Sequence, residues 1–257
     1  MKNRFLTATP EKGGFDSALN EHARAFRSKA LVNVEHKCLL YVQQREFAAT
    51  TPADNSVTVI GSDDATTCHL VVVRHSGSGA TCLAHCDGSN TWAEVPQLVK
   101  AVTSLSSQAK EGRLELHLIG GFDDESKTSQ SLSLSLLELN DIVTDGIHRP
   151  VVYGVGVNVK TGEVFPASLP TRGPAEELRS ARTFTGGQMV DIYDSGKQQV
   201  KYLSTSPQAE PPHFVQHMKT TIQFLLDHPS PDSLFPGGRP QLFRRTEQGS
   251  WDRVPQQ

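Results

Sequence analysis

One stretch of this chain constrains its fold more than any other, because it predicts a single β-hairpin that carries both a cysteine and a histidine. Residues 71–73 form an apolar β-branched run, residues 75–79 (HSGSG) have turn chemistry, and residues 80–84 resume the strand pattern. A two-residue loop at Gly77-Ser78, with glycine first as a type II′ turn prefers, sets the register of the two strands.

That register places Cys68 and His85 on the same face of the sheet. Leu70 then lies opposite His85 and Cys68 opposite Asp87, so the thiol and the imidazole are diagonal neighbours about 7–8 Å apart. A slip of one residue would put them on opposite faces. A histidine beside a thiol accepts its proton and later protonates a leaving amine, which is the equipment of nucleophilic acyl chemistry. The spacing alone also fits a buried structural cysteine beside a hydrogen-bonded histidine.

Longer motifs around this hairpin resemble one enzyme family. Residues 61–88 look like the core signature of the protein N-terminal asparagine amidohydrolases, and further similar stretches lie at 39–46, 120–122, 203–214 and 228–230. The pattern is also similar to the chemoreceptor glutamine deamidases, in which a hydroxyl residue six positions before the cysteine completes the site. The resemblance therefore implies a catalytic set of Cys68, His85 and Ser62, with Ser62 either orienting His85 or binding the oxyanion.

The resemblance also implies an activity. It is the cysteine-dependent conversion of N-terminal asparagine in proteins or peptides to aspartate, with release of ammonia, no cofactor and a role in the N-degron pathway of ubiquitin-dependent degradation. A substrate of this kind has a free ammonium group, which a buried site should meet with a carboxylate. Asp63, Asp64 and Asp87 are the acids nearest to the hairpin site, and Glu210 is added because its segment resembles the family.

The chain departs from the family pattern in three places. About 30 residues at the start do not match, a further apolar strand is missing after residue 139, and an aromatic- and proline-rich segment is missing between Lys201 and Leu203. We therefore expect a shortened member of the family. One alternative is a catalytically inactive form that acts as a binding or regulatory protein.

A second alternative is a zinc-stabilised Cys/His module. In the register above, Cys82, Cys86 and His69 share the face opposite the candidate nucleophile, and both residue types are zinc ligands. The C-x₃-C spacing, however, lies on a strand instead of a turn. His213 and His217 are four residues apart on a predicted helix, a spacing that can bind metal, but no HExxH motif accompanies them. We therefore expect no metal site.

Composition restricts the partners and the compartment. With 257 residues, 37% hydrophobic and 21% charged, the chain has the composition of a globular protein. Its net charge of −3 gives no reason to expect nucleic acid or an anionic membrane as partner. No apolar run approaches the ~18 residues of a membrane span, and no signal-peptide pattern is present. The four cysteines do not resemble a disulfide framework, so we expect the protein in the cytoplasm or nucleus. We also expect it to be a monomer.

Helical and strand patterns alternate along the chain, which predicts an α+β fold of layered antiparallel β-sheets flanked by helices. The resemblance refines this to an α-β-β-α sandwich-like deamidase fold. We expect a poorly ordered or divergent segment over 1–30 and a single amidohydrolase domain over 31–257. Leu114, Leu116 and Leu118 alternate with polar residues and are predicted to point inward. The predicted helices are 16–28, 95–105, 126–139, 175–184 and 212–226, the strands 38–48, 56–60 and 113–119, and the further hairpins 151–167, 189–203 and 241–254.

Overall fold

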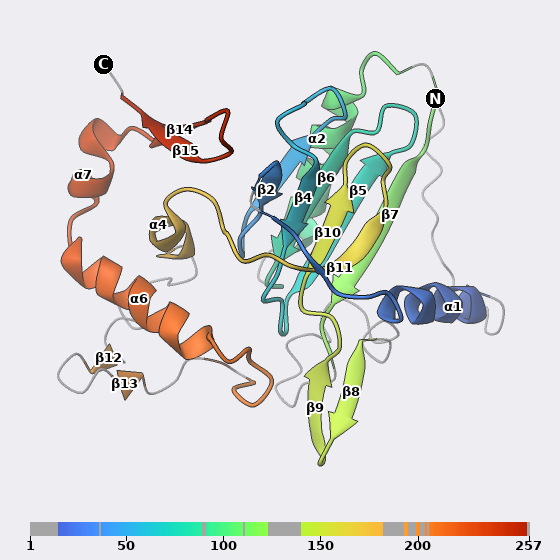
Figure 1. Cartoon of the computed structure of the whole chain (residues 1–257), viewed down its shortest axis with the longest axis horizontal. Helices are drawn as coiled ribbons and strands as arrows, with labels where there is room; N and C mark the ends of the chain where they lie inside the picture. The colour runs from blue at the N-terminus through green and yellow to red at the C-terminus, as the bar shows by residue number, and fades with distance from the viewer. Residues whose placement is uncertain are drawn as a thin grey trace.

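Two β-sheets stacked face to face form the body of the computed structural model (Figure 1). The structure describes residues 15–35, 37–88, 91–109, 111–122, 140–181, 193–194, 199–200, 204 and 206–255. The five-stranded sheet has the order β1 (Val32–Asn33), β11 (Val164–Ser168), β10 (Val155–Asn158), β4 (Val59–Ser62) and β2 (Leu39–Tyr41). The four-stranded sheet has the order β3 (Phe47–Thr50), β6 (Thr81–Cys86), β5 (His69–His75) and β7 (Leu114–Gly120).

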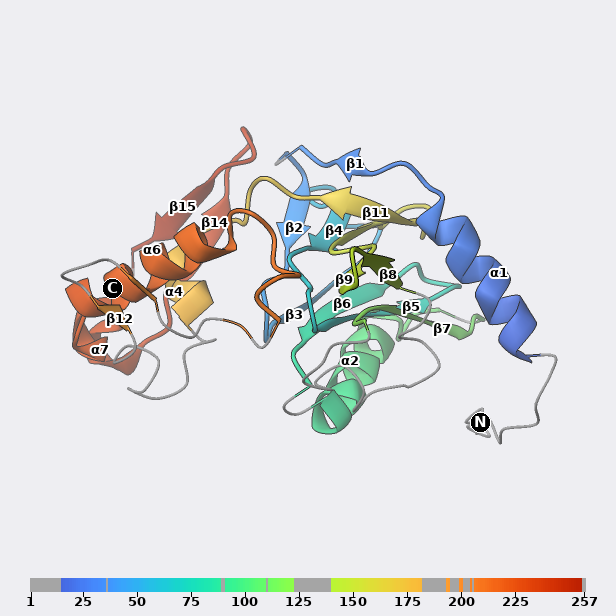
Figure 2. The same ribbon diagram turned by 90° about the horizontal axis from the view of Figure 1, so that it is seen from below.

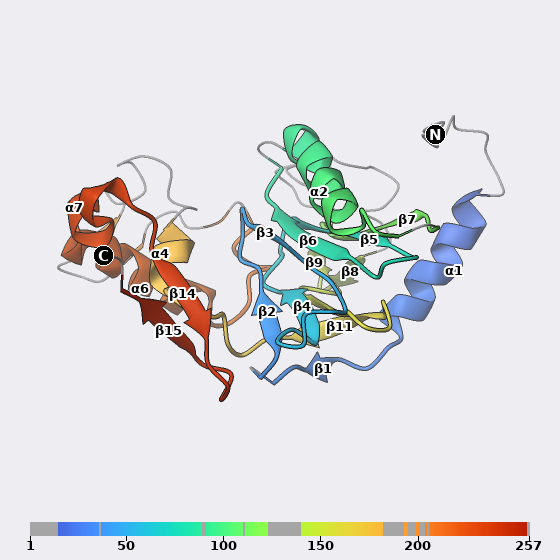
Figure 3. The ribbon, with the colours of Figure 1, turned by 90° about the horizontal axis from the view of Figure 1, so that it is seen from above.

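The main hydrophobic core lies between the two sheets. Fully buried side chains from both sheets meet there, among them Ile60 of β4, Leu70 of β5 and Val155 of β10. On its other face the four-stranded sheet is covered by α2 (Thr91–Leu105), whose Leu98 and Val102 pack against it (Figure 2). Helix α1 (Phe15–Arg27) lies at the edge of the five-stranded sheet, beside β11 (Figure 3). This layering confirms the α+β class.

The five-stranded sheet is mixed, whereas antiparallel sheets were expected throughout. Strand β10 pairs antiparallel with both β11 and β4, but β2 is parallel to β4 and β1 is parallel to β11. The parallel β2–β4 pair arises because the chain leaves β2, forms β3 in the other sheet, and returns to run in the same direction as before.

The hairpin of β5 and β6 has the predicted register, with Leu70 opposite His85, but the predicted turn type is wrong. The loop spans residues 76–79: the His75 N–H donates to the Ala80 carbonyl at 2.9 Å, and the Gly79 N–H donates to the His75 carbonyl at 2.8 Å. The positive φ of 73° belongs to Gly79, not to Gly77 as a type II′ turn requires. The register is unchanged because the four-residue loop is centred on the same two residues.

Most other predicted elements are present. The predicted helices 16–28, 95–105 and 212–226 correspond to α1, α2 and α6 (Phe214–Asp227), and two hairpins to β10–β11 and β14 (Leu242–Arg245)–β15 (Trp251–Val254). The predicted helix 175–184 contains α4 (Glu176–Ser180). The predicted hairpin 189–203 contains the short pair β12 (Tyr193–Asp194)–β13 (Gln199–Val200). The predicted helix 126–139 lies outside the described residues. The hairpin β8 (Asp141–Thr144)–β9 (Ile147–Pro150), α7 (Pro231–Leu234) and the 3₁₀ helix η3 (Pro236–Gly238) were not predicted.

The prediction for β7 is wrong in its orientation. Leu114, Leu116 and Leu118 are 44%, 60% and 43% exposed, while Ile119 packs against the core between the sheets. Leu118 pairs with Val71 and Leu116 with Val73, so these leucines lie on the face that α2 covers. Because β7 is the edge strand, α2 covers the other strands on this face and leaves the three leucines exposed to solvent. The alternation identifies which residues share a face, but not how far the covering layer extends.

The described part of the chain from α4 to β15 lies beside the sandwich, next to the end of β2 (Figure 1). Helix α4 packs against α6. Arg179 of α4 connects this part to the sandwich, because its Nη2 donates to the Tyr41 carbonyl at 2.9 Å and to Glu46 at 2.7 Å. Among the described residues, no helix combines the length and the apolar composition needed to cross a bilayer.

Candidate active site

A side-chain hydrogen bond at His85 connects the two sheets. Ser62 ends β4 and His85 lies on β6, and Ser62 Oγ is 2.7 Å from His85 Nδ1, with both residues buried. Strand β6 is held here by the turn at 43–46, since the His85 N–H donates to the Glu46 carbonyl at 3.0 Å and the Arg45 N–H donates to the His85 carbonyl at 2.9 Å. The contact between serine and histidine that the resemblance implied is therefore present.

The second ring nitrogen of His85, Nε2, differs from Nδ1 in its surroundings. His85 Nε2 is buried and has no hydrogen-bond partner among the described residues. In a neutral imidazole one nitrogen donates and the other accepts. A proton on Nδ1, donated to the Ser62 hydroxyl, leaves Nε2 with a free lone pair, so the ring is arranged to accept a proton at Nε2.

Cys68 lies on the His85 side of the hairpin. It directly precedes β5 and is 8% exposed, in the same core cluster as Leu70 and Val72. Because Leu70 pairs with His85 and Cys68 shares a core cluster with Leu70, Cys68 and His85 lie on the same side of the hairpin, as the register predicted. The backbone of Gly120 crosses closely behind the cysteine: a Cβ there would lie 2.5 Å from the Cys68 carbonyl oxygen, and its φ is +109°. Only glycine fits this position, which explains one glycine of the 120–122 motif.

Both candidate reactive groups are neutral at rest. Burial raises the pKa of the Cys68 thiol well above its ordinary value, and the negative charges of Asp87 and Glu210 raise it further. Burial lowers the pKa of His85 to about 4. The resting groups are therefore a thiol and a neutral imidazole.

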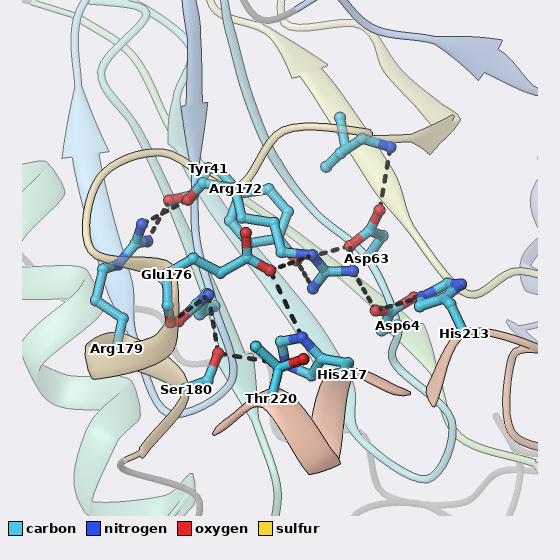
Figure 4. Close-up of polar contacts among 12 residues, drawn as sticks. Tyr41, Asp63, Asp64, Arg172, Glu176, Arg179, Ser180, His213, His217 and Thr220 are labelled. Atoms are coloured by element: carbon cyan, nitrogen blue, oxygen red, sulfur yellow. Dashed lines mark hydrogen bonds and ion pairs between the residues drawn. The ribbon is translucent and has the colours of Figure 1, made fainter. Parts of the chain in front are cut away.

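A small cavity of about 70 Å³ lies beside His85. This volume suits one small polar side chain and is well below the ~300–1,000 Å³ of typical drug-sized pockets. Its walls come from both parts of the molecule, as Figure 4 shows for several of the residues. The sandwich contributes Tyr41, Gln43, Gln44, Asp63, Asp64 and His85. The C-terminal part, taken from here on to include the connection between β11 and α4, contributes Arg172, Ser180, Phe214, His217 and Met218.

Two adjacent carboxylates share one guanidinium in this cavity (Figure 4). Asp63 accepts from the Tyr41 hydroxyl at 2.6 Å and from the Leu169 N–H at 3.0 Å, and Arg172 lies 3.5 Å away. Asp64 forms an ion pair with Arg172, which also donates to the Tyr41 hydroxyl at 2.8 Å. Burial and the charge of Asp64 raise the pKa of Asp63. Burial acts in the same direction on Asp64, but Arg172 and His213 together outweigh it, and the pKa of Asp64 lies below its ordinary value.

The other two predicted acids lie outside the cavity wall. Asp87, just after β6, is 2.5 Å from Arg45 Nε. Glu210 accepts from the Thr66 hydroxyl at 2.8 Å and from Ser204, and burial raises its pKa. Of the four acids considered from the sequence, the structure thus brings Asp63 and Asp64 to the cavity.

Sequence reasoning missed the cavity residues that come from distant parts of the chain. Tyr41 and Gln43 lie in the family-like stretch 39–46, but the resemblance was not used to give them a role, and Arg172 and Ser180 lie in no such stretch. One signal was available: two neighbouring acids near a buried site need a basic partner. That argument predicts a cation beside Asp63 and Asp64, but it does not say which of the chain's arginines or lysines supplies it.

The zinc alternative finds no support in the described part of the chain, which contains no group of three or more residues placed to hold a metal ion. Cys82 and Cys86 pack in the core under α2. His69 is buried, and burial lowers its pKa to about 4. His213 and His217, the pair with metal-binding spacing, contact Asp64 at 3.0 Å and Glu176 at 3.5 Å respectively.

A buried cysteine, histidine and serine beside a small acidic cavity, on an α+β scaffold, are the parts of an amide hydrolase. The family model described as "Protein N-terminal asparagine amidohydrolase" matches residues 29–139, 134–202 and 197–253. The chain belongs to this family. The matched stretches overlap at 134–139 and 197–202, next to the two places where the sequence was expected to lack family segments.

Curated relatives agree with the family match. The chain is 45% identical to the protein N-terminal asparagine amidohydrolase of Sus scrofa and 44% identical to that of Homo sapiens, in each case over 92% of this chain and 90% of the relative. It is 26% identical to the Arabidopsis thaliana protein of the same name, over 83% of this chain and 80% of the relative.

Proposed function

We propose that this chain is a cysteine-dependent amidohydrolase that converts the N-terminal asparagine of proteins or peptides to aspartate and releases ammonia. The observation that carries the proposal is the buried Ser62–His85 contact of 2.7 Å. His85 also lines an acidic cavity, and Cys68 lies on the same side of the hairpin as His85. Support for the substrate comes from the names of relatives that are 44–45% identical to this chain.

The reaction begins with attack by the thiol. As Cys68 Sγ bonds to the side-chain carboxamide carbon, its proton passes to His85 Nε2, and the carbonyl oxygen becomes an oxyanion. The C–N bond then breaks while His85 returns the proton to the departing nitrogen, which leaves as ammonia. The product of this half is a thioester between Cys68 and the substrate side chain.

Water completes the reaction. His85 Nε2 takes a proton from the water that attacks the thioester carbon, and the C–S bond breaks as the proton is given to the departing sulfur. The side chain is now a carboxylic acid, which ionises to aspartate. Throughout, Ser62 holds the His85 ring by accepting from Nδ1–H, so that Nε2 faces the reacting atoms. This route uses side chains of the chain and water.

The acidic cavity fits the ammonium group of a terminal residue. Asp63, Asp64 and Glu176 carry three formal negative charges around the single guanidinium of Arg172, so the cluster retains a net negative charge at neutral pH. An ammonium group that enters the cavity compensates this charge, whereas an acetylated amine does not. Asp63 and Asp64 are therefore proposed as the residues that select a free N-terminus.

The wider role follows from the same resemblance. We place the activity in the N-degron pathway, in which the new N-terminal aspartate is read for ubiquitin-dependent degradation. The protein would act as a monomer in the cytoplasm or nucleus, on protein or peptide substrates. The family resemblance, the near-neutral net charge and the cysteine usage support this placement.

A catalytically inactive binding form is the second candidate. It is favoured by one observation: the family match is divided into three ranges that overlap at 134–139 and 197–202, next to the places where we expected family segments to be missing. If those segments complete the pocket, a protein that keeps the buried Cys–His pair will still fail to turn over substrate.

Ammonia release and the mass change of a short Asn-first peptide separate the two candidates. A Gln-first peptide and an N-acetylated Asn peptide serve as controls. Conversion of the free Asn peptide alone supports the amidohydrolase and its need for the terminal amine. A well-folded sample that binds the Asn peptide without converting it supports the inactive form.

A further inference from the structure

A second polar group faces the same cavity as His85 and has no assigned role. Gln43 lines the cavity, its side chain is 4% exposed, and its Oε1 is buried without a hydrogen-bond partner among the described residues. A buried acceptor without a partner is costly, so this oxygen is suited to a donor that arrives with a ligand.

The orientation of the Gln43 amide follows from its neighbours. Its Nε2 lies 3.5 Å from the Glu176 carbonyl oxygen and 3.3 Å from Ser180 Oγ. A carbonyl oxygen only accepts, so the amino group must face α4 and the carbonyl oxygen is left for the cavity.

The backbone around Gln43 is also held in place. Its N–H donates to Glu46 Oε2 at 3.0 Å, and its carbonyl accepts from the Glu46 N–H at 3.0 Å. The same turn pairs with the backbone of His85. Gln43 and His85 are therefore carried by directly bonded segments and line one cavity. Each holds a buried atom without a partner among the described residues, Oε1 and Nε2, which can serve one substrate group as an acceptor and a proton carrier.

We propose that Gln43 is a specificity residue whose Oε1 accepts an N–H of the substrate carboxamide, the nitrogen that leaves as ammonia. This inference rests on the proposed function. The substrate offers two donors, but its charged ammonium matches Asp63 and Asp64, which leaves the neutral acceptor for the neutral amide. The bond turns the amide nitrogen toward His85, which must protonate it.

The assignment has a consequence for the product. Aspartate carries a carboxylate oxygen where asparagine carries the NH₂ group, so Gln43 Oε1 meets a second acceptor in place of a donor. The contact that holds the substrate then repels the product, and a site built in this way discriminates strongly between the two. Gln43 thus favours release of the Asp-first product after each turnover.

The test compares an Asn-first substrate with the Asp-first peptide of the same sequence. Gln43→Met keeps the length of the side chain and removes the acceptor. We expect kcat/KM for the Asn-first peptide to fall about 10–100-fold, the loss of one buried hydrogen bond. The inhibition constant of the Asp-first peptide is expected to stay the same or to fall, because the repulsion is gone. Gln97→Met, on the exposed face of α2, is the matched control and should change neither constant.

A purely structural role gives a different result, since a distorted cavity weakens both peptides together. Equal losses for both, or no loss for the Asn-first peptide, would overturn the assignment while leaving the proposed function intact. Should Gln43→Met fail to fold by thermal unfolding, Gln43→Asn keeps the amide but withdraws it by one methylene group. It should lower kcat/KM for the Asn-first peptide without weakening inhibition by the Asp-first peptide, and equal losses for both would again overturn the assignment. If the unmodified protein converts no Asn-first peptide, the proposed function fails and the inference fails with it.

Discussion

Replacing Arg172 by methionine would show how the acidic cavity is held together. The guanidinium is 14% exposed and is shared by Asp63 and Asp64, whose side chains are 12% and 24% exposed. It also donates to the Tyr41 hydroxyl at 2.8 Å and lies 5.3 Å from the centre of that ring. Methionine keeps much of the packing volume but leaves two neighbouring carboxylates without their common cation.

The expected loss of folding stability is large for a single substitution. Removing one partner of a buried ion pair destabilises a protein by about 3–5 kcal/mol, because the remaining charge stays buried. In a chain of this size each kcal/mol lowers the melting temperature by roughly 2–4 °C. Arg172→Met should therefore lower the melting temperature by roughly 6–20 °C at neutral pH.

The loss should also depend on pH. In the unmodified protein the pKa of Asp64 lies below its ordinary value, so Asp64 stabilises the fold above about pH 4 and this contribution is lost as pH falls through its folded pKa. Without Arg172, the pKa of Asp63 rises further above its unfolded value, and Asp64 loses the strongest influence that lowers its pKa. The variant then loses stability as pH rises above about 4, because folded-state carboxyls must ionise while buried. The gap to the unmodified protein is therefore wider at pH 8 than at pH 5.

Thermal unfolding followed by circular dichroism at these two pH values is a sufficient assay. Arg113→Met is the matched control, because Arg113 pairs with Glu115 at 2.9 Å with its side chain 80% exposed, and such surface pairs contribute little. A melting temperature of Arg172→Met within the change seen for the control, or a gap of equal size at both pH values, would refute the reasoning.

Four further predictions concern the reacting groups. Cys68→Ala should abolish ammonia release and leave the circular dichroism spectrum unchanged; undiminished turnover would exclude a Cys68 nucleophile. Ser62→Ala leaves His85 Nδ1 unpaired, so initial rates should show kcat reduced about 10–100-fold with KM nearly constant. Because the pKa of His85 is about 4, kcat should fall only as pH drops through about 4, when the base becomes protonated; a fall centred near the ordinary value of about 6.5 would contradict this. Glu210→Gln removes a negative charge near Cys68 and should speed alkylation by iodoacetamide at fixed pH, whereas an unchanged rate would exclude that influence.

The hairpin shows why part of the site was predictable from sequence. The β-branched run and the centre of the turn determine which residues of β5 and β6 face each other, so Cys68 and His85 were placed correctly although the turn type was wrong. Strand register depends on where a loop is centred and on which residues alternate, and both are local properties of the sequence.

The features that were not predicted depend on contacts between distant segments, which local sequence does not encode. The leucines of β7 alternate as a buried strand would, but whether they are covered depends on how far α2 reaches across the sheet. Arg172 meets Asp63 and Asp64 only because the strands between them fold back and bring distant segments together. Gln43 is an ordinary polar residue after a short strand, and only its packing against α4 shows which end of its amide is free.

The origin of the cavity walls couples binding to tertiary assembly. His85, Gln43 and Asp63 come from the sandwich, whereas Arg172 and Ser180 come from the C-terminal part, so an occupant contacts both and holds them together. By thermodynamic linkage, a ligand at a hundred times its dissociation constant contributes about 2.7 kcal/mol to the docked arrangement if it binds only there. Substrate is in this sense a transient cross-link, and the docking of α4 and α6 is strongest during the part of the catalytic cycle in which the cavity is filled.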